Sequence, residues 1–260
     1  MQSLITQGYV ADSMRLDKFV CKSTALNRQQ ALLAITAGEL TVNGKVALDA
    51  GMQVHESNCI ELGGRLLVLR PFRYLLLNKP MDTLCSNVDG DYPSIFNLID
   101  VPNPYELHIA GRLDADTTGL VLITDDGRWS FNVFNPKYHC QKVYRVRLRN
   151  SIEGERKGEI DRQLVARFEQ GLQLPGETKP TLPAKLVYVS DHEVLLTIGE
   201  GRYHQVKRMF ATVGNRVKAL HRERVGNIQC DVASGAWRYL SDDEVTGFGF
   251  SPLSELDGLN

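Results

Sequence analysis

Residues 111–120, Gly-Arg-Leu-Asp-Ala-Asp-Thr-Thr-Gly-Leu, place two carboxylates close behind an arginine. Asp114 and Asp116, with Asp125 at the twelfth position, nearly fit a calcium-binding loop, which uses carboxylate oxygens as ligands. That position normally carries Glu, however, and the apolar segments on either side have the pattern of strands where a calcium hand needs helices. The pattern therefore disfavours calcium. A turn would account for Asp116, but it leaves Arg112 without an explanation.

A second cluster, residues 138–147, sets a tyrosine among cations. On a strand Lys142 and Tyr144 would share a face, because side chains alternate along the chain. A phenol between cations can stack on a nucleobase and still offer a polar tip. Taken alone, the segment favours a simpler interpretation, in which Tyr144 is an ordinary strand aromatic packed in the core.

The third cluster is Glu-Gly-Arg-Tyr-His-Gln-Val-Lys-Arg-Met-Phe over residues 200–210. If Tyr203 opens a helix, the apolar residues that follow form its buried stripe, and Gln205 and Arg208 lie three apart on another face. His204 has no His or Cys at a spacing that suits a shared metal. We therefore interpret His204 as a hydrogen-bonding residue.

The distribution of charge points to a polyanionic partner, although the formal net charge is only −1. Residues 137–149 hold five cations and no acid, and residues 202–224 hold seven cations and one acid. Residues 81–126 show the opposite bias, with nine acids and Arg112 as the only base. Phosphate binding responds to local potential, so the two basic runs favour RNA or DNA as a partner.

Composition excludes several classes of protein. The 260 residues are 43% hydrophobic and 23% charged, as expected for one or two globular domains. The longest apolar runs are too short to span a bilayer, and the N-terminus lacks the basic start and apolar core of a secretory signal. The five cysteines form no CxxC pair, which argues against a zinc site or a disulfide framework. We predict a reduced, cytoplasmic protein without a membrane partner.

Periodicity divides the chain into two parts. Apolar residues recur at helical spacing over 16–20 and 31–35, and Asn43-Gly44 then separates two alternating segments, which is typical of a β-hairpin. After Gly63-Gly64, strand-like and helix-like stretches alternate. The predicted divisions are an N-terminal extension over 1–13, a small module over 14–63, a linker over 64–72, an α/β unit over 73–250 and a C-terminal tail over 251–260. Within the second part we predict strands at 73–78, 106–110, 119–124, 141–149, 185–190 and 193–198, and helices at 93–99, 126–134, 155–170, 203–213 and 241–247.

Together the three clusters have a more specific meaning. GRLDxDTTGLxxxTDDG, KxY and EGRYHQVKRM, in this order behind MRLDKFV, resemble the pseudouridine synthases of the RsuA branch. The resemblance covers about residues 14–250, and its first part is similar to an S4 RNA-binding domain. It implies an α+β protein in which a small S4-like module precedes a mixed, largely antiparallel catalytic domain. Tyr203-His204 favours the branch members that act on small-subunit RNA. Asp82 stands where the family normally has Gly.

The resemblance also implies roles for individual residues. Asp114 would act at the sugar C1′ as a nucleophile or would deprotonate C2′, and Lys207 would be the cation that keeps it charged. Tyr144 would stack on the target base and help to remove the C5 proton, and Arg112 would fill the space that the flipped base leaves. The remaining RNA contacts would come from Lys142, Arg145, Arg208 and Arg222, and in the S4-like module from Arg15, Lys18, Lys22 and Arg28. Uridine isomerisation exchanges no electrons and loses no group, so no cofactor or metal is expected.

The implied reaction converts a specific uridine of 16S ribosomal RNA, uridine 516, to pseudouridine, with the RNA carried by an assembling small subunit. Three alternatives stay open. One is the same chemistry on 23S RNA, and another is a non-catalytic assembly factor with the same fold, which would not need Asp114, Tyr144 and Lys207 together. The third is a glycosidase that uses Asp116 as its second acid.

Overall fold

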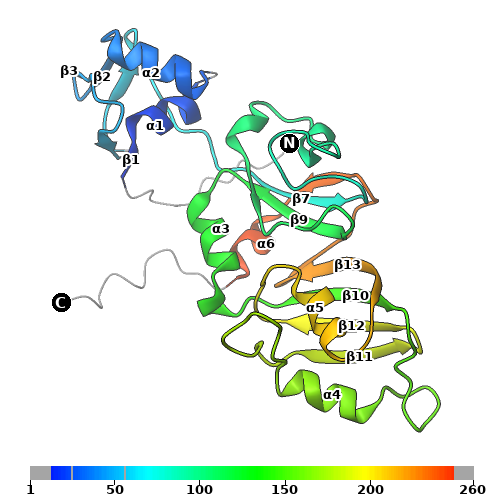
Figure 1. Cartoon of the computed structure of the whole chain (residues 1–260). Coiled ribbons are helices and arrows are strands. Elements are labelled where there is room, and N and C mark those ends of the chain that lie inside the picture. Colours follow the sequence, from blue (N-terminus) through cyan, green and yellow to red (C-terminus); the bar gives the residue numbers. More distant parts are fainter. Residues whose placement is uncertain (1–12, 25, 56, 249–260) are drawn as a thin grey trace, which may run out of the picture. The chain divides into compact units, whose positions relative to one another are not determined.

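A computed structural model describes residues 13–24, 26–55 and 57–248, which divide into two units between Phe72 and Arg73 (Figure 1). Apart from Ser13, the predicted N-terminal extension and C-terminal tail lie outside the described residues. Each unit has its own buried apolar cluster. The two units are therefore described separately.

The first unit packs two short helices against small sheets. The second helix begins with a capping box, which was not predicted from the sequence. The Asn27 side chain accepts from the Gln30 N–H, and the Gln30 side chain accepts from the Asn27 N–H. Asn43 and Gly44 both have positive φ, 52° and 76°, as the predicted two-residue hairpin turn requires. The elements are β1 (Met14–Arg15), α1 (Leu16–Ser23), α2 (Arg28–Thr36), β2 (Leu40–Val42), β3 (Lys45–Val46), β4 (Gln53–Val54), β5 (Ile60–Leu62) and β6 (Arg65–Leu66).

The segment predicted to be a linker begins as part of this unit. Gly63 and Gly64, with φ of 56° and 79°, form a turn between β5 and β6, which pair as an antiparallel hairpin. Leu67 then packs into the core of the unit and is 8% exposed. The glycine pair therefore marks a tight turn, and the structure differs from the prediction over the first residues of 64–72.

The second unit is built on one long sheet with the strand order β11-β12-β10-β13-β9-β7-β15, to which β8 adds beside β9 and β14 beside β13. The pair β13–β9 is parallel, and the other pairs are antiparallel. The strands are β7 (Tyr74–Lys79), β8 (His108–Ala110), β9 (Thr118–Thr124), β10 (Lys142–Leu148), β11 (Lys185–Ser190), β12 (Glu193–Ile198), β13 (Val217–Val225), β14 (Ile228–Gln229) and β15 (Trp237–Tyr239).

Helices cover the two halves of this sheet. Phe168 of one helix and Phe210 of another are both fully buried, and through these side chains the two helices pack on the half formed by β10, β11 and β12. On the other half, Ile95 and the inward side chains of β7 and β9 form a second cluster. The helices are α3 (Gly127–Phe134), α4 (Arg162–Glu169), α5 (Gln205–Thr212) and α6 (Asp242–Thr246), with 3₁₀ turns at Ile95–Leu98, Pro104–Glu106 and Pro136–Tyr138.

The predicted α+β class with a largely antiparallel sheet is confirmed. Two details differ from the predictions. The helix expected over 155–170 begins only at Arg162, after the cap that Asp161 provides, and the helix expected over 93–99 is a 3₁₀ turn. The strands β13, β14 and β15 had no counterpart in the prediction. No helix in the described part of the chain is both long and apolar enough to cross a bilayer.

Candidate active site

The loop between β8 and β9 carries Arg112, Asp114 and Asp116, and two glycines fix its ends. Gly111 has φ of 74°, and a side chain there would overlap the ring of Phe134. Gly119 has φ of 105°, and a side chain there would overlap the backbone of Arg222 on β13. Both positions need glycine, because the backbone is left-handed and because Phe134 or Arg222 already occupies the space that a side chain would need.

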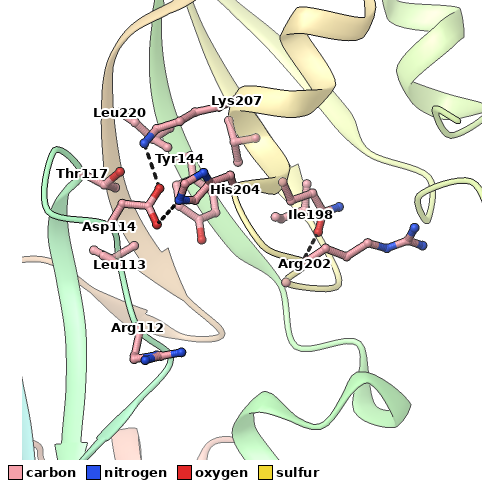
Figure 2. Close-up of a pocket in the computed structure, with 13 residues that line it drawn as sticks. Arg112, Leu113, Asp114, Thr117, Tyr144, Ile198, Arg202, His204, Lys207 and Leu220 are labelled. Atoms are coloured by element: carbon pink, nitrogen blue, oxygen red, sulfur yellow. Dashed lines mark hydrogen bonds and ion pairs between the residues drawn. The ribbon is translucent and has the colours of Figure 1, made fainter. Parts of the chain in front are cut away.

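The opposite wall of the site comes from the start of α5. Nζ of Lys207 lies 2.8 Å from Oδ2 of Asp114 and 2.6 Å from Oδ1 of Asp116. His204, the residue before the first turn of the helix, places Nε2 3.2 Å from the other oxygen of Asp114, Oδ1 (Figure 2). The Asp114 carboxylate is therefore held at both oxygens. Asp116, interpreted from sequence as a turn residue only, is a second partner of the lysine.

These contacts perturb the ionisation of the site. Burial alone would lower the pKa of Lys207, but its hydrogen bonds to Asp114 and Asp116 outweigh burial and raise that pKa above its ordinary value. Burial opposes the ionisation of Asp116, and the hydrogen bond from Lys207 nevertheless holds the pKa of Asp116 below its usual range. At neutral pH the ammonium of Lys207 therefore faces the ionised carboxylate of Asp116.

A pocket of about 80 Å³ opens beside this ion pair (Figure 2). Tyr144, which is 8% exposed, reaches it from β10, and Arg112 reaches it from the β8–β9 loop. The pocket thus joins the charged groups to an apolar wall on which a flat ring can lie. Its lining comprises Arg112, Leu113, Asp114, Thr117, Tyr144, Ile198, Gly201, Arg202, His204, Gln205, Val206, Lys207 and Leu220.

Comparisons with known proteins agree with this geometry. The RNA pseudouridylate synthase family matches residues 73–212, and the S4 domain family matches residues 14–58. The chain is 45% identical over 234 residues to ribosomal small subunit pseudouridine synthase A of Vibrio cholerae, which covers 89% of this chain and 98% of that protein. The chain belongs to this synthase family.

Two further relatives support the assignment. The Vibrio parahaemolyticus protein of the same name is 47% identical over 236 residues, covering 89% of this chain and 98% of the relative. A solved pseudouridylate synthase is 42% identical, with a TM-score of 0.64, and covers 91% of this chain and all of the solved chain. The chain is thus a pseudouridine synthase, an enzyme that isomerises uridine to pseudouridine, with an N-terminal S4 domain.

Two buried cations of the synthase hold the loop of Asp114 and were not predicted for this role. Lys79 is fully buried at the end of β7, and its Nζ donates to the carbonyls of Pro80, Ala115 and Thr117 at 2.9, 3.0 and 2.9 Å. Burial lowers the pKa of Lys79. The sequence contained a hint, because a lysine that closely follows the apolar run Leu75–Leu77 needs buried acceptors if it continues the strand.

Arg222 is the second of these cations, and here the sequence-based expectation of a phosphate contact was wrong. The side chain is buried, with a relative exposure of 2%, and it donates to the carbonyls of Leu120 at 2.8 Å and Gly111 at 2.6 Å. Both acceptors flank the loop that carries Asp114. The guanidinium therefore braces the loop from β13 and faces away from solvent.

The structure also changes the interpretation of the other cations near the site. Lys142 does share the face of β10 with Tyr144, but it is 4% exposed, its ammonium lies 5.2 Å from the centre of the Phe134 ring, and burial lowers its pKa. Such a buried side chain does not suit the predicted substrate contact. Arg208 is paired with Glu177 at 2.8 Å and donates to two backbone carbonyls. Arg145 is paired with Glu193 and Glu223.

In the S4 unit, three of the four predicted RNA contacts lie on the surface. Arg15 and Arg28 are 49% and 80% exposed and both approach the buried carboxylate of Asp17, at 3.0 and 3.4 Å. Lys18 is exposed. Lys22 is 5% exposed and lies over the ring of Phe72, 3.7 Å from its centre, so that it is part of the packing of the unit. Burial of Lys22 contradicts its predicted role as a surface contact.

Within the described ranges, no group of three or more His, Cys, Asp or Glu side chains is arranged to hold a metal ion. The sequence of the Asp114 loop nearly matches a calcium site. In the structure the ammonium of Lys207 contacts Asp114 and Asp116 and so occupies the position that a metal ion would need. Thr117, which lines the pocket, has a buried hydroxyl with no hydrogen-bond partner among the described residues.

Proposed function

We propose that this synthase isomerises one uridine of 16S ribosomal RNA, uridine 516, and that Asp114 carries out the chemistry at its sugar. The observation that carries the proposal is the pocket in which the Asp114 carboxylate, held by Lys207 and His204, lies beside Tyr144. The relatives that match nearly the whole chain are named for the ribosomal small subunit. We place the reaction in the cytoplasm, on RNA in an assembling subunit.

The reaction begins at the C1′–N1 bond of the flipped uridine. The Asp114 carboxylate either attacks C1′ as that bond breaks or removes the proton from C2′, and the electron pair of the broken bond stays on N1 of the base. After the base has rotated, C5 forms the new bond to C1′ as the Asp114–C1′ bond breaks or, on the second route, as Asp114 returns the proton to C2′. Tyr144 then helps to remove the C5 proton. The net change moves the glycosidic bond from N1 to C5 and a proton from C5 to N1.

Positioning and charge would supply most of the acceleration. The base must leave its stack, at a cost of a few kcal/mol, and Tyr144 would offer it a new stacking surface. Lys207 would place a positive charge 2.8 Å from the Asp114 carboxylate, where it attracts the negative charge that the reaction uses. Arg15, Lys18 and Arg28 of the S4 unit would bind RNA phosphates, which positions the enzyme without reading sequence.

Asp114→Asn tests the assignment, because it keeps the size of the side chain and removes its charge. We expect a folded protein that binds RNA within several-fold of wild type and forms no pseudouridine, measured by chemical derivatisation and primer extension. Asp191→Asn, at an exposed carboxylate outside the pocket, is the matched control and should keep full activity.

Mapping pseudouridines in RNA from cells with and without the protein tests the substrate. Loss of the site at 516 in 16S RNA supports the proposal, whereas loss of a site in 23S RNA would favour the large subunit. Turnover by Asp114→Asn at the wild-type rate would contradict the catalytic assignment. If neither RNA changes and the protein only alters subunit assembly, a non-catalytic role is the better explanation.

A further inference from the structure

Tyr203 is the most exposed large apolar side chain in the described part of the chain, with 78% of its surface open. It precedes α5 and lies next to His204 and Arg202, which both line the pocket. Its ring stacks on the His204 ring, with 3.7 Å between ring centres and 20° between planes. One face of the phenol is therefore covered by the imidazole, and the other faces solvent.

The turn that presents Tyr203 is held rigidly. Gln205, 4% exposed, accepts from the Arg202 N–H at 2.8 Å and donates to Glu200 at 2.9 Å. Arg208 donates to the carbonyl of Tyr203 at 3.2 Å. An exposed aromatic ring on a fixed backbone loses little freedom when it binds, and that property suits a binding surface.

His204 connects this surface to the reaction centre. Its backbone is left-handed, with φ of 48°, a conformation that residues other than glycine adopt rarely and mainly where the surroundings require it. The conformation lets the imidazole stack on Tyr203 while its Nε2 contacts Asp114 at 3.2 Å. A ring stacked on the free face of Tyr203 would therefore lie beside the pocket, with the Tyr203 and His204 rings between it and the Asp114 carboxylate.

We propose that the free face of Tyr203 binds an unpaired nucleobase adjacent to the target uridine, with His204 as its rigid support. The inference rests on the proposed RNA substrate. A nucleobase fits because stacking on an exposed aromatic tolerates any base, and because the ring adjoins the pocket of a synthase that acts on RNA. The stacked base would anchor the chain on one side of the flipped uridine.

Binding of a small-subunit RNA fragment that the wild-type enzyme modifies tests this surface, with affinities measured in the inactive Asp114→Asn background. Tyr203→Ala should weaken binding about tenfold, since one stacked base contributes roughly 5- to 150-fold in affinity. Tyr203→Phe keeps the ring and should bind within about twofold of the parent. Tyr105→Ala, at a 52% exposed tyrosine outside the pocket lining, is the control and should have no effect.

RNA with an abasic nucleotide at either neighbour of the uridine identifies the partner. At one of the two positions, the abasic RNA and Tyr203→Ala should each cost about tenfold, and their combination should cost no more than either alone.

Two results would overturn the inference. Wild-type affinity of Tyr203→Ala, or additive losses at both neighbouring positions, would show that no base stacks on Tyr203. In either case the enzyme still modifies the fragment, so the proposed function stands. Failure of the wild-type enzyme to modify any small-subunit RNA would instead overturn the proposed function and this inference with it.

Discussion

Replacing Lys207 by methionine removes the one ammonium that contacts both Asp114 and Asp116. At the observed 2.8 Å, a unit charge pair is worth about 6 kcal/mol at an effective dielectric of 20 and about 1.5 kcal/mol in water. The lysine and Asp114 side chains are 27% and 32% exposed, and Asp116 is 66% exposed, so solvent screens both pairs. After desolvation is subtracted, we expect the variant to lose about 1–2 kcal/mol of unfolding free energy.

The loss of activity should be much larger than the loss of stability. Lys207→Met leaves Asp114 without its ammonium partner and leaves two carboxylates that repel each other in one site. Removing a single electrostatic partner of a reacting group typically lowers kcat by about 10²–10³-fold. Lys207→Arg keeps the charge with a different shape and should retain an intermediate activity. Pseudouridine formation in single-turnover reactions measures these rates.

The stability difference should also depend on pH. The pKa of Asp116 is lowered in the folded state, so its contribution is present above the unfolded value and is lost as pH falls through the folded one. The pKa of Lys207 is raised, so its contribution is present below the unfolded value and is lost as pH rises through the folded one. The difference between wild type and Lys207→Met should therefore be full between about pH 5 and pH 10 and shrink outside that window.

Urea denaturation across this range, with Lys185→Met on an exposed strand position as the control, checks the reasoning. Folded Lys207→Met with activity within a few-fold of wild type would refute the claim that the ammonium serves Asp114. A stability difference that does not change between pH 3 and pH 7 would refute the assignment of the ion pair to Asp116.

Three further substitutions test the surroundings of the site. Gly119→Ala should cost about 3 kcal/mol in urea denaturation, because its φ is 105° and a side chain would overlap the neighbouring strand. Arg222→Met should cost about 2–4 kcal/mol through the lost bonds to Gly111 and Leu120, with the salt dependence of RNA binding unchanged; a shallower salt slope would indicate a phosphate contact after all. Lys142→Met should be more stable than wild type at pH 7, because burial lowers the pKa of Lys142 and penalises its charge. This advantage should shrink as pH rises and disappear above the unfolded pKa of about 10.4.

The strands that the sequence predicts best are those with a simple burial pattern. β11 and β12 alternate or nearly alternate buried and exposed positions, and both were predicted with their observed bounds. β13 was missed because its nine residues include three cations and an acid, and one of its core positions is Arg222. A strand whose buried position is an arginine has no apolar alternation to detect, since the compensating carbonyls come from distant residues.

The candidate site shows a similar division. The family motifs drew attention to Asp114, Tyr144 and Lys207, and the structure brings all three to one pocket. The alternation of side chains along a strand also predicted that Lys142 and Tyr144 share a face. Such a pattern indicates the face on which a side chain lies, but it does not indicate whether other elements bury that face. Lys22 was misplaced for the same reason, because the ring of Phe72 that lies under its ammonium is fifty residues away in the sequence.

The parallel pair β9–β13 explains how charges 93 residues apart form one site. β9 follows directly from the loop of Asp114, and β13 follows α5, which carries Lys207. Arg222 lies at this junction: its backbone pairs with Gly119, and its guanidinium holds the carbonyls at both ends of the loop. A displacement of β13 against β9 would therefore change the distance between carboxylate and ammonium directly. Substitution of Arg222 should therefore lower the turnover rate of the folded enzyme, although its side chain is buried.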